Sequence, residues 1–284
     1  MALLCIRRFC MFWKKAVLAV SAAVLVFGIA ACGQKEAPKS ASVSQETTIK
    51  IGTLSGPHSE FLEEVKKNSE KKGLKLEIVE FNDFIAPDEA LNNKEIDANM
   101  MQHQPFLDRI VKDRGYKLVS VGKTILFPMG VYSQKIKSKD EIKDGMTVVI
   151  PNDPSNGGRA LEILEHAGLL KLSVSKGAKA TVNDITENPK HLNITEADAA
   201  MIPRMLPDVD FGVINNSYAI KAGFVPTKDA FIREGADSPY ANVLVVREED
   251  KDKPSTKLLL DCIRTPEMKK FVEDHFKGSA VAAW

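Results

Sequence analysis

Cysteine is scarce in this chain, and its positions exclude a disulfide framework. Four cysteines occur among 284 residues: Cys5, Cys10, Cys32 and Cys262. A disulfide-stapled exported domain needs an even set of cysteines spread through its folded part, and only Cys262 lies beyond residue 32. Because no activating base surrounds it in the apolar stretch 258–263, we expect a small buried side chain there rather than a nucleophile.

A large excess of charge of one sign is also missing. The whole chain has a formal charge of +1, and the first 31 residues hold four basic and no acidic side chains. The remainder therefore has a formal charge of −3. Proteins that follow nucleic acids gain affinity by neutralising phosphates with basic side chains, so we expect no nucleic-acid partner.

The sequence lacks the usual catalytic and metal motifs. It has no convincing nucleophile elbow, P-loop or HExxH pattern. The histidines beyond the leader show no metal-ligand spacing: His58, His103, His166, His191 and His275. We therefore predict no enzyme activity, no metal and no cofactor.

Only one long apolar run is present, and it lies near the N-terminus. Arg7, Arg8, Lys14 and Lys15 precede a mainly apolar stretch from 16 to 31, which is short for a membrane span. A basic leader, an apolar run and small residues at its end are typical of a secretory signal. We assign residues 1–31 to this signal, with Met1 or Met11 as the start.

The run ends in Ile29-Ala30-Ala31-Cys32, which resembles a bacterial lipobox. In a lipobox the cysteine is diacylated on sulfur and becomes the first mature residue; the alternative is an ordinary signal that happens to contain a cysteine. We expect Cys32 to be lipidated and to hold the protein on a cell membrane, facing the periplasm or the cell exterior. Residues 33–48 have the polar composition of a flexible tether.

From Ile49 onward, strand-like and helix-like stretches alternate, which is typical of an α/β protein with a mostly parallel sheet. Residues 74–81 read as a strand and residues 59–72 as a helix. No linker interrupts the alternation, so we predict two α/β lobes joined by segments that cross near residues 125–133 and 238–245. The expected limits are 49–127 plus 243–284 for lobe 1, and 128–242 for lobe 2.

Polar motifs follow several predicted strands. The stretch 151–159 (PNDPSNGGR) leads from a strand into a helix, where a helix N-terminus and Arg159 would favour an anion and the glycines would let a ligand approach the backbone. A capped turn with a surface arginine is the alternative. Gln102 and His103 occupy a similar place, where His103 could be a metal ligand, a base or a hydrogen-bond donor, or else a simple helix cap or polar contact.

Four more positions have both a functional and a structural interpretation. Phe81 and Phe84 follow a strand and could form the wall of an apolar pocket or belong to the core. Asn215 and Asn242 lie at strand edges, where amides suit a zwitterion but are also common in turns.

These motifs occur in an order that resembles the NlpA-type methionine-binding lipoproteins. The resemblance runs from the lipobox to Trp284. It rests on the segments 81–83, 97–103, 113–118, 151–154, 213–215 and 238–240 (FND, DANMMQH, DRGYKL, PNDP, VIN and SPY).

The resemblance implies a two-lobed, type II periplasmic-binding-protein fold with a ligand cleft between the lobes. It also implies a substrate-binding component of a methionine ABC importer, with a permease and an ATPase as partners. Arg159 would hold the ligand carboxylate, and Asn215 and Asn242 would hydrogen-bond its amino and carboxylate ends. His103 and Phe84 would line the side-chain pocket, with Gln102 and Phe81 close by.

Two positions depart from the family pattern. Phe84 stands where tyrosine is common, and Met101 stands where an aromatic residue is common. Loss of a sulfur–aromatic contact, worth roughly 0.3–1.5 kcal/mol, would soften selection for a thioether. L-methionine remains the first expectation. Another small amino acid, a methionine-containing dipeptide, a surface antigen or adhesin without a transport function, and an exported hydrolase are the alternatives.

Overall fold

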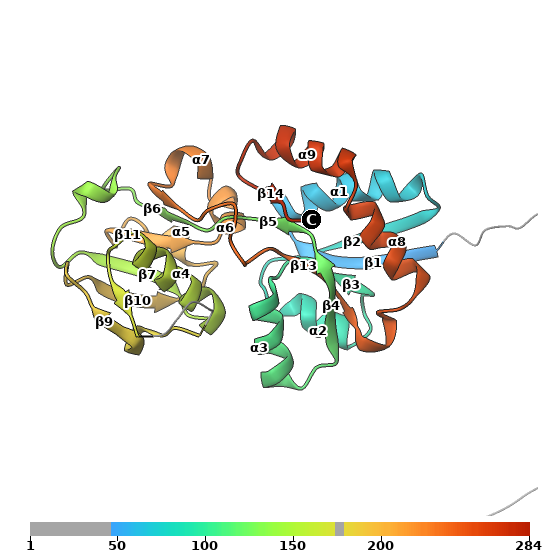
Figure 1. Cartoon of the computed structure of the whole chain (residues 1–284), viewed down its shortest axis with the longest axis horizontal. Coiled ribbons are helices and arrows are strands. Elements are labelled where there is room, and N and C mark those ends of the chain that lie inside the picture. The colour runs from blue at the N-terminus through green and yellow to red at the C-terminus, as the bar shows by residue number, and fades with distance from the viewer. Residues whose placement is uncertain (1–46, 174–178) are drawn as a thin grey trace, which may run out of the picture. The chain divides into compact units, whose positions relative to one another are not determined.

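The computed structural model describes residues 47–173 and 179–284 (Figure 1). The expected signal, the lipidation site Cys32 and most of the tether lie outside the described residues. Among the helices that the structure describes, none is both long and apolar enough to cross a bilayer.

The first lobe is built on a five-stranded sheet covered by helices on both faces. Its strands follow the order β2 (Leu74–Phe81), β1 (Thr47–Leu54), β3 (Ala98–Asn99), β13 (Val243–Arg247), β4 (Leu118–Lys123). One face packs against α1 (Pro57–Glu70), α8 (Pro254–Ile263) and α9 (Pro266–Phe276). The other face packs against α2 (Ala86–Asn92) and α3 (Gln104–Arg114).

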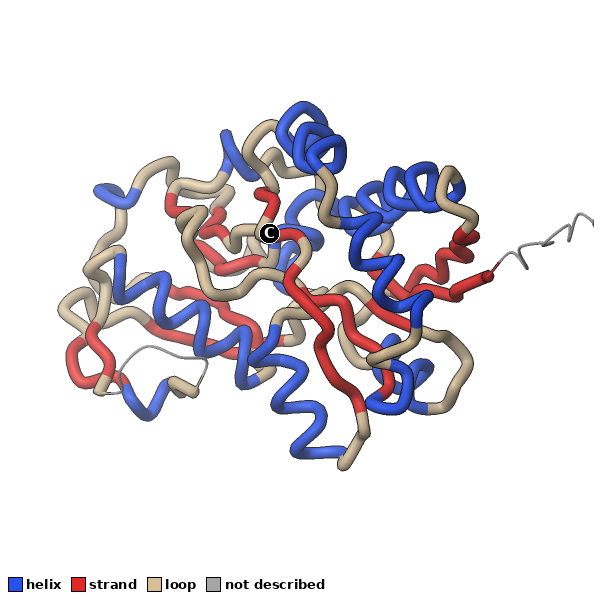
Figure 2. Tube along the Cα trace, turned by 45° about the vertical axis from the view of Figure 1, so that its right-hand side comes forward, coloured by secondary structure: helices blue, strands red, loops and turns tan. Residues whose placement is uncertain are grey.

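The second lobe repeats this architecture. Its strands follow the order β10 (Asn193–Ala197), β7 (Thr147–Pro151), β11 (Phe211–Ile214), β6 (Gly130–Tyr132), β12 (Ile232–Arg233). The sheet lies between α4 (Pro154–His166) on one side and α5 (Ile202–Met205) with α6 (Asn216–Lys221) on the other. The remaining elements of this lobe are α7 (Pro226–Asp229) and the antiparallel pair of β8 (Lys171–Leu172) and β9 (Ile185–Glu187). Figure 2 shows helices (blue) beside the strands (red) of both lobes.

Each sheet contains one strand that runs against the other four. In the first sheet it is β13, antiparallel to β3 and β4; in the second it is β6, antiparallel to β11 and β12. Each of these strands directly follows a passage of the chain from one lobe to the other. The passage into the second lobe contains β5 (Ile125–Leu126), which pairs with the C-terminal β14 (Val281–Ala282).

The architecture confirms the predicted α/β class and the mostly parallel strand direction. Cys262 is a buried free thiol within the α8 core contact, and burial raises its pKa. The residue limits given above for the two lobes stay a prediction.

Candidate functional site

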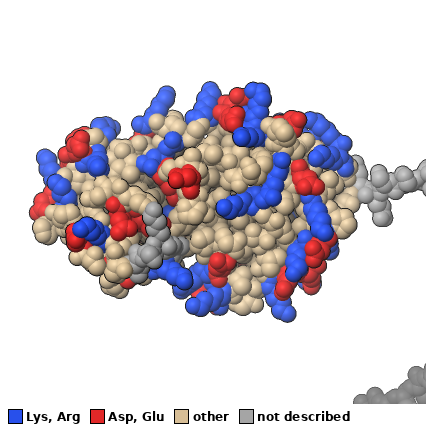
Figure 3. All heavy atoms as spheres, in the orientation of Figure 1, with Lys and Arg blue, Asp and Glu red and all other residues tan. Residues whose placement is uncertain are grey.

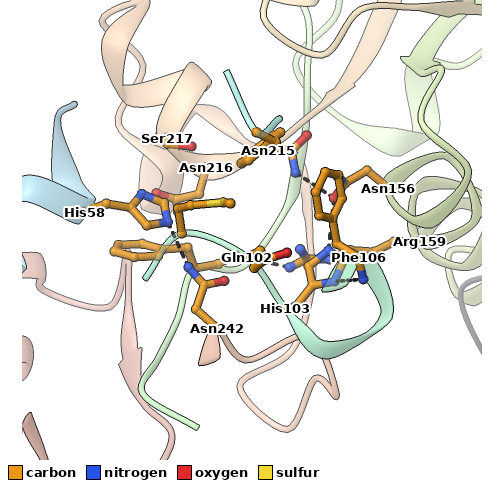
Figure 4. A pocket seen from close by; sticks show the side chains of 13 residues that line it. His58, Gln102, His103, Phe106, Asn156, Arg159, Asn215, Asn216, Ser217 and Asn242 are labelled. Atoms are coloured by element: carbon orange, nitrogen blue, oxygen red, sulfur yellow. Dashed lines mark hydrogen bonds between the residues drawn. The ribbon is translucent and has the colours of Figure 1, made fainter. Parts of the chain in front are cut away.

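A pocket lies between the lobes, with about 350 Å³ of empty space that includes parts open to solvent. Segments that follow the ends of β1, β2 and β3 form one wall, and segments that follow β7 and β11 form the opposite wall. In both lobes these are the carboxyl ends of parallel strands, where open α/β sheets bind ligands. The lining residues (Figure 4) are His58, Phe84, Met101, Gln102, His103, Phe106, Phe127, Asn156, Arg159, Asn215, Asn216, Ser217 and Asn242.

The structure brings six of the seven expected site residues to this pocket: Phe84, Gln102, His103, Arg159, Asn215 and Asn242. Phe81 is not among the lining residues. The alternation of β2 places it on the same face as Val79, against the α2 side of the first core, so the core interpretation describes its packing. The functions of all seven residues as ligand contacts stay predictions.

The guanidinium group of Arg159 is already paired with a carboxylate of the protein. Its Nε donates to Glu234 Oε1 at 3.0 Å, while Nη2 donates to Glu234 Oε2 and to the Phe127 carbonyl. The guanidinium carbon also lies 4.7 Å from the centre of the Tyr240 ring. The Arg159 side chain is 4% exposed and that of Glu234 10%. A buried, two-pronged carboxylate partner fixes the guanidinium plane and offsets much of its charge.

Sequence reasoning missed Glu234 because it lies 75 residues from Arg159 in the chain. An acidic side chain in the stretch 232–237 (IREGAD) carries no pattern of its own. The two residues come into contact only in the folded protein, where the end of β12 lies against α4.

Asn156 links three parts of the site at the start of α4. Its Nδ2 donates to both carboxylate oxygens of Asp153, at 3.1 and 3.0 Å, and this fixes the orientation of the amide. Its Oδ1 then accepts from Asn215 Nδ2 at 2.9 Å and from His103 Nε2 at 3.2 Å. Asn215 Oδ1 remains buried without a partner among the described residues, so it is available as an acceptor.

His103 caps α3 and also connects the lobes. Its Nδ1 accepts from the Phe106 backbone N–H at 3.3 Å, while Nε2 faces Asn156 of the second lobe. These two bonds require the neutral ring with its proton on Nε2. Burial, with a smaller effect of nearby Arg159, lowers the pKa of His103 to about 3. The cap and the pocket interpretations of this residue therefore both describe its environment.

A buried polar cluster supports the pocket from the first lobe. Gln102 Nε2 donates to Asp88 Oδ1 at 2.6 Å and to Asn99 Oδ1 at 3.1 Å. Asn99 Nδ2 donates to the same Asp88 oxygen at 2.8 Å. Both amide protons of Gln102 are thus used, and its buried Oε1 has no partner within the described chain. Burial raises the pKa of Asp88 to about 6.

Aromatic side chains form the apolar part of the pocket. The Phe84 ring lies 5.8 Å from Phe106 and 5.3 Å from Tyr218, measured between ring centres. Met101 is 1% exposed and lines the same space. The two positions that depart from the family pattern, Phe84 and Met101, therefore both face the pocket.

Gly157 has a different function from the expected one. A Cβ atom on this residue would lie 2.8 Å from the Pro151 carbonyl oxygen, and its N–H donates to the Asp153 carbonyl at 2.8 Å within the helix. The missing side chain lets the first turn of α4 pack closely on the end of β7. It does not open the backbone N–H to a ligand.

Among the described residues, no group of three or more histidine, cysteine, aspartate or glutamate side chains is arranged to hold a metal ion. Figure 3 shows basic and acidic side chains interspersed over the face that it draws.

Comparison with known proteins finds lipoproteins and methionine-binding proteins as relatives. Residues 49–284 match the family model described as NlpA lipoprotein. The D-methionine-binding lipoprotein MetQ of Salmonella typhimurium is 44% identical over 276 residues, covering 96% of this chain and 99% of that protein. Outer membrane lipoprotein 2 of Mannheimia haemolytica is 43% identical, covering 93% and 97%. A nutrient-binding protein of Burkholderia cenocepacia, solved with bound methionine, is 50% identical with a TM-score of 0.80, covering 83% of this chain and all of that one.

Proposed function

This chain belongs to the NlpA lipoprotein family, and from that membership we propose that it captures methionine at a membrane surface and delivers it to an ABC importer. The relatives named for methionine binding match nearly its full length. The lipid anchor belongs to the same proposal: the family consists of lipoproteins, and Cys32 ends a lipobox-like sequence. The lipid would hold the binding domain near its permease, on the periplasmic or outer face of the membrane.

The observation that carries the proposal is the chemical complementarity of the pocket between the lobes. Asn215 Oδ1 and Gln102 Oε1 are buried acceptors without partners in the described structure, which suits an ammonium group. Arg159 offers positive charge for a carboxylate, although Glu234 shares it. Phe84 and Phe106 supply an apolar wall for the side chain. An acceptor group, a cationic donor and an aromatic wall together match an apolar amino acid.

Titration calorimetry tests the proposal directly. The purified protein should bind L-methionine, and parallel titrations with D-methionine and methionyl dipeptides would define selectivity. Absence of binding to all of these ligands would contradict the proposal. A captured ligand of another kind would appear in mass spectrometry of the purified protein.

The expected function of Arg159 is tested by removing its charge without leaving Glu234 unpaired. The double variant Arg159→Met with Glu234→Gln should weaken methionine binding by roughly 10- to 150-fold, the equivalent of one charge-assisted bond. Arg204→Ala, which removes an exposed arginine of α5 that does not line the pocket, is the control. Equal affinities for the double variant and the control would show that Arg159 does not hold the carboxylate.

A different small amino acid or a methionine-containing dipeptide is the second candidate ligand. Phe84 and Met101 favour testing it, because both departures from the family pattern line the pocket. A thermal-shift panel separates these ligands, since a tight ligand raises the melting temperature by mass action.

A further inference from the structure

We infer that His58 is a ligand-contacting residue that donates its Nδ1–H to an acceptor atom of the bound amino acid. This inference rests on the proposed function and extends it. His58 lies in the first turn of α1, directly after β1, and lines the pocket from the first lobe (Figure 4). Its sequence context, Gly56-Pro57-His58, resembles a plain helix start, so sequence reasoning did not select it.

The tautomer of His58 follows from its neighbour. Asn242 Nδ2 lies 2.8 Å from His58 Nε2. An amide nitrogen only donates, so Nε2 of the imidazole must accept and carries no proton. Burial lowers the pKa of His58 to about 3, so the ring is neutral at physiological pH. A neutral imidazole with a bare Nε2 carries its proton on Nδ1.

This Nδ1–H group makes no hydrogen bond within the described structure. His58 is 3% exposed, and Nδ1 is a buried atom without a hydrogen-bond partner in the described structure. Burying a donor without an acceptor costs free energy, so such groups are rare in native structures. An acceptor on a ligand in the pocket that His58 lines would satisfy it.

The surroundings hold the ring in place for this contact. The His58 ring lies 4.2 Å from the Phe127 ring, between centres, while Asn242 fixes it from the other side. Its two neighbours restrict both the position and the rotation of the imidazole, so little side-chain freedom is lost when a ligand binds.

The position of His58 distinguishes it from Arg159. In Figure 4 the two side chains lie on opposite sides of the pocket, with Gln102 and Asn215 between them. The site therefore presents hydrogen-bond donors from two directions. Methionine has two kinds of acceptor, the carboxylate oxygens and the weaker thioether sulfur, and the experiment below distinguishes them.

Two variants separate the donated bond from packing. His58→Phe keeps an aromatic ring against Phe127 but removes the donor; His58→Gln can still accept from Asn242 and donate to a ligand. We expect His58→Phe to weaken L-methionine binding about tenfold and His58→Gln to stay nearer to wild type. Melting temperatures of both ligand-free variants show whether the fold is retained.

Ligand analogues identify the acceptor. 3-(Methylthio)propylamine lacks the carboxylate and has no oxygen in its place, and norleucine replaces the sulfur with carbon. The loss caused by His58→Phe should disappear for the one analogue that lacks the atom His58 contacts. An equal loss for all three ligands would show that His58 acts only through Asn242, and binding by His58→Phe within twofold of wild type would also overturn the inference.

The tautomer is tested independently of any ligand. In protein labelled with ¹⁵N-histidine, His58, assigned by comparison with His58→Gln, should show the Nδ1–H form, and its Nδ1 signal should shift on titration with L-methionine. A proton on Nε2 would overturn the inference even if methionine binds. If wild-type protein ignores methionine, the proposed function fails, and the same variants are then titrated with whichever ligand raises the melting temperature.

Discussion

At the scale of single residues, the pocket is organised by side chains that use one polar atom for the protein and leave another for a ligand. Asn215 donates through Nδ2 to Asn156 and leaves Oδ1 unpaired. Gln102 donates through Nε2 and leaves Oε1 unpaired. Amides held in this way cannot flip, so their acceptors are fixed before a ligand arrives. Such preorganisation lowers the entropic cost of binding.

The buried carboxyl group of Asp88 makes the stability of the folded protein depend on pH. The pKa of its carboxyl is raised by burial from 3.8 to about 6 in the folded protein. A raised carboxyl pKa stabilises the folded state fully below about pH 3.8, and this contribution is lost as the pH rises through about 6. The difference between the two pKa values corresponds to about 3 kcal/mol. Asp88→Asn keeps an acceptor for Gln102 but cannot titrate.

We therefore expect the stability of Asp88→Asn, relative to wild type, to improve as the pH rises from 4 to 7.5. Urea denaturation at several pH values measures this difference. Asp108→Asn, on the exposed face of α3, is the control and should show no such trend. Parallel pH profiles of wild type and Asp88→Asn would mean that the carboxyl does not titrate in this range.

Sequence reasoning found the pocket residues that belong to motifs and missed those defined by distant partners. Arg159 and Asn215 stand in recognisable segments at strand ends. His58 contacts Asn242 across 184 positions, and the partner of Arg159 is 75 positions away. Local pattern carries no information about such pairs, because only the closed lobes bring them together.

At the scale of secondary-structure elements, the N-terminus of α4 contributes both to the stability of the fold and to the orientation of pocket side chains. The Asp153 side chain caps the helix by accepting from the Asn156 backbone N–H at 2.9 Å, and it also holds the Asn156 side chain. We expect Asp153→Ala to lower the free energy of unfolding by about 0.5–2 kcal/mol, as loss of a cap does. It should also weaken ligand binding, because Asn156 would no longer orient Asn215 and His103.

A second helix provides the control for this prediction. Thr265 caps α9 of the first lobe by accepting from the Met268 backbone N–H at 3.2 Å. Thr265→Ala should cost similar stability in urea denaturation and leave the calorimetric affinity unchanged. If both variants lost affinity equally, the effect of Asp153 would come from general destabilisation.

Most element positions could be predicted because their patterns are local. Strand β2 occupies the predicted residues 74–81, and α4 begins at Pro154, within the stretch 151–159 that the sequence predicts to lead from a strand into a helix, because Asp153 is its cap. The two-residue strand β3 gives no periodic signal, since it is recognisable only through its pairing with β1 and β13. Short helices such as α5 and α6 also give no periodic signal in the sequence, because they contain too few residues.

At the scale of the whole described fold, the two lobes touch across the pocket and also at its rim. Tyr218 of α6 donates to the Asn82 carbonyl of the first lobe at 3.4 Å. Nearby, Lys221 Nζ donates to Ser55 Oγ at 2.6 Å and to Asn82 Oδ1 at 3.2 Å. Contacts that exist only when the lobes are together favour the closed form, and a ligand that binds both walls shifts the population in the same direction.

Lys221 allows this coupling to be tested away from the pocket. Lys221→Met removes the rim bonds, and an exposed contact of this kind is worth about 0.2–1 kcal/mol. We expect a two- to fivefold loss of ligand affinity, mainly through faster dissociation in stopped-flow measurements, because the closed form opens more readily. Lys190→Met, which removes the same charge from an exposed loop of the second lobe, should leave dissociation unchanged. Equal rates for the two variants would show that the rim bonds do not hold the lobes closed. A loss confined to Lys221→Met would show that closure, and not only direct contact, contributes to ligand retention.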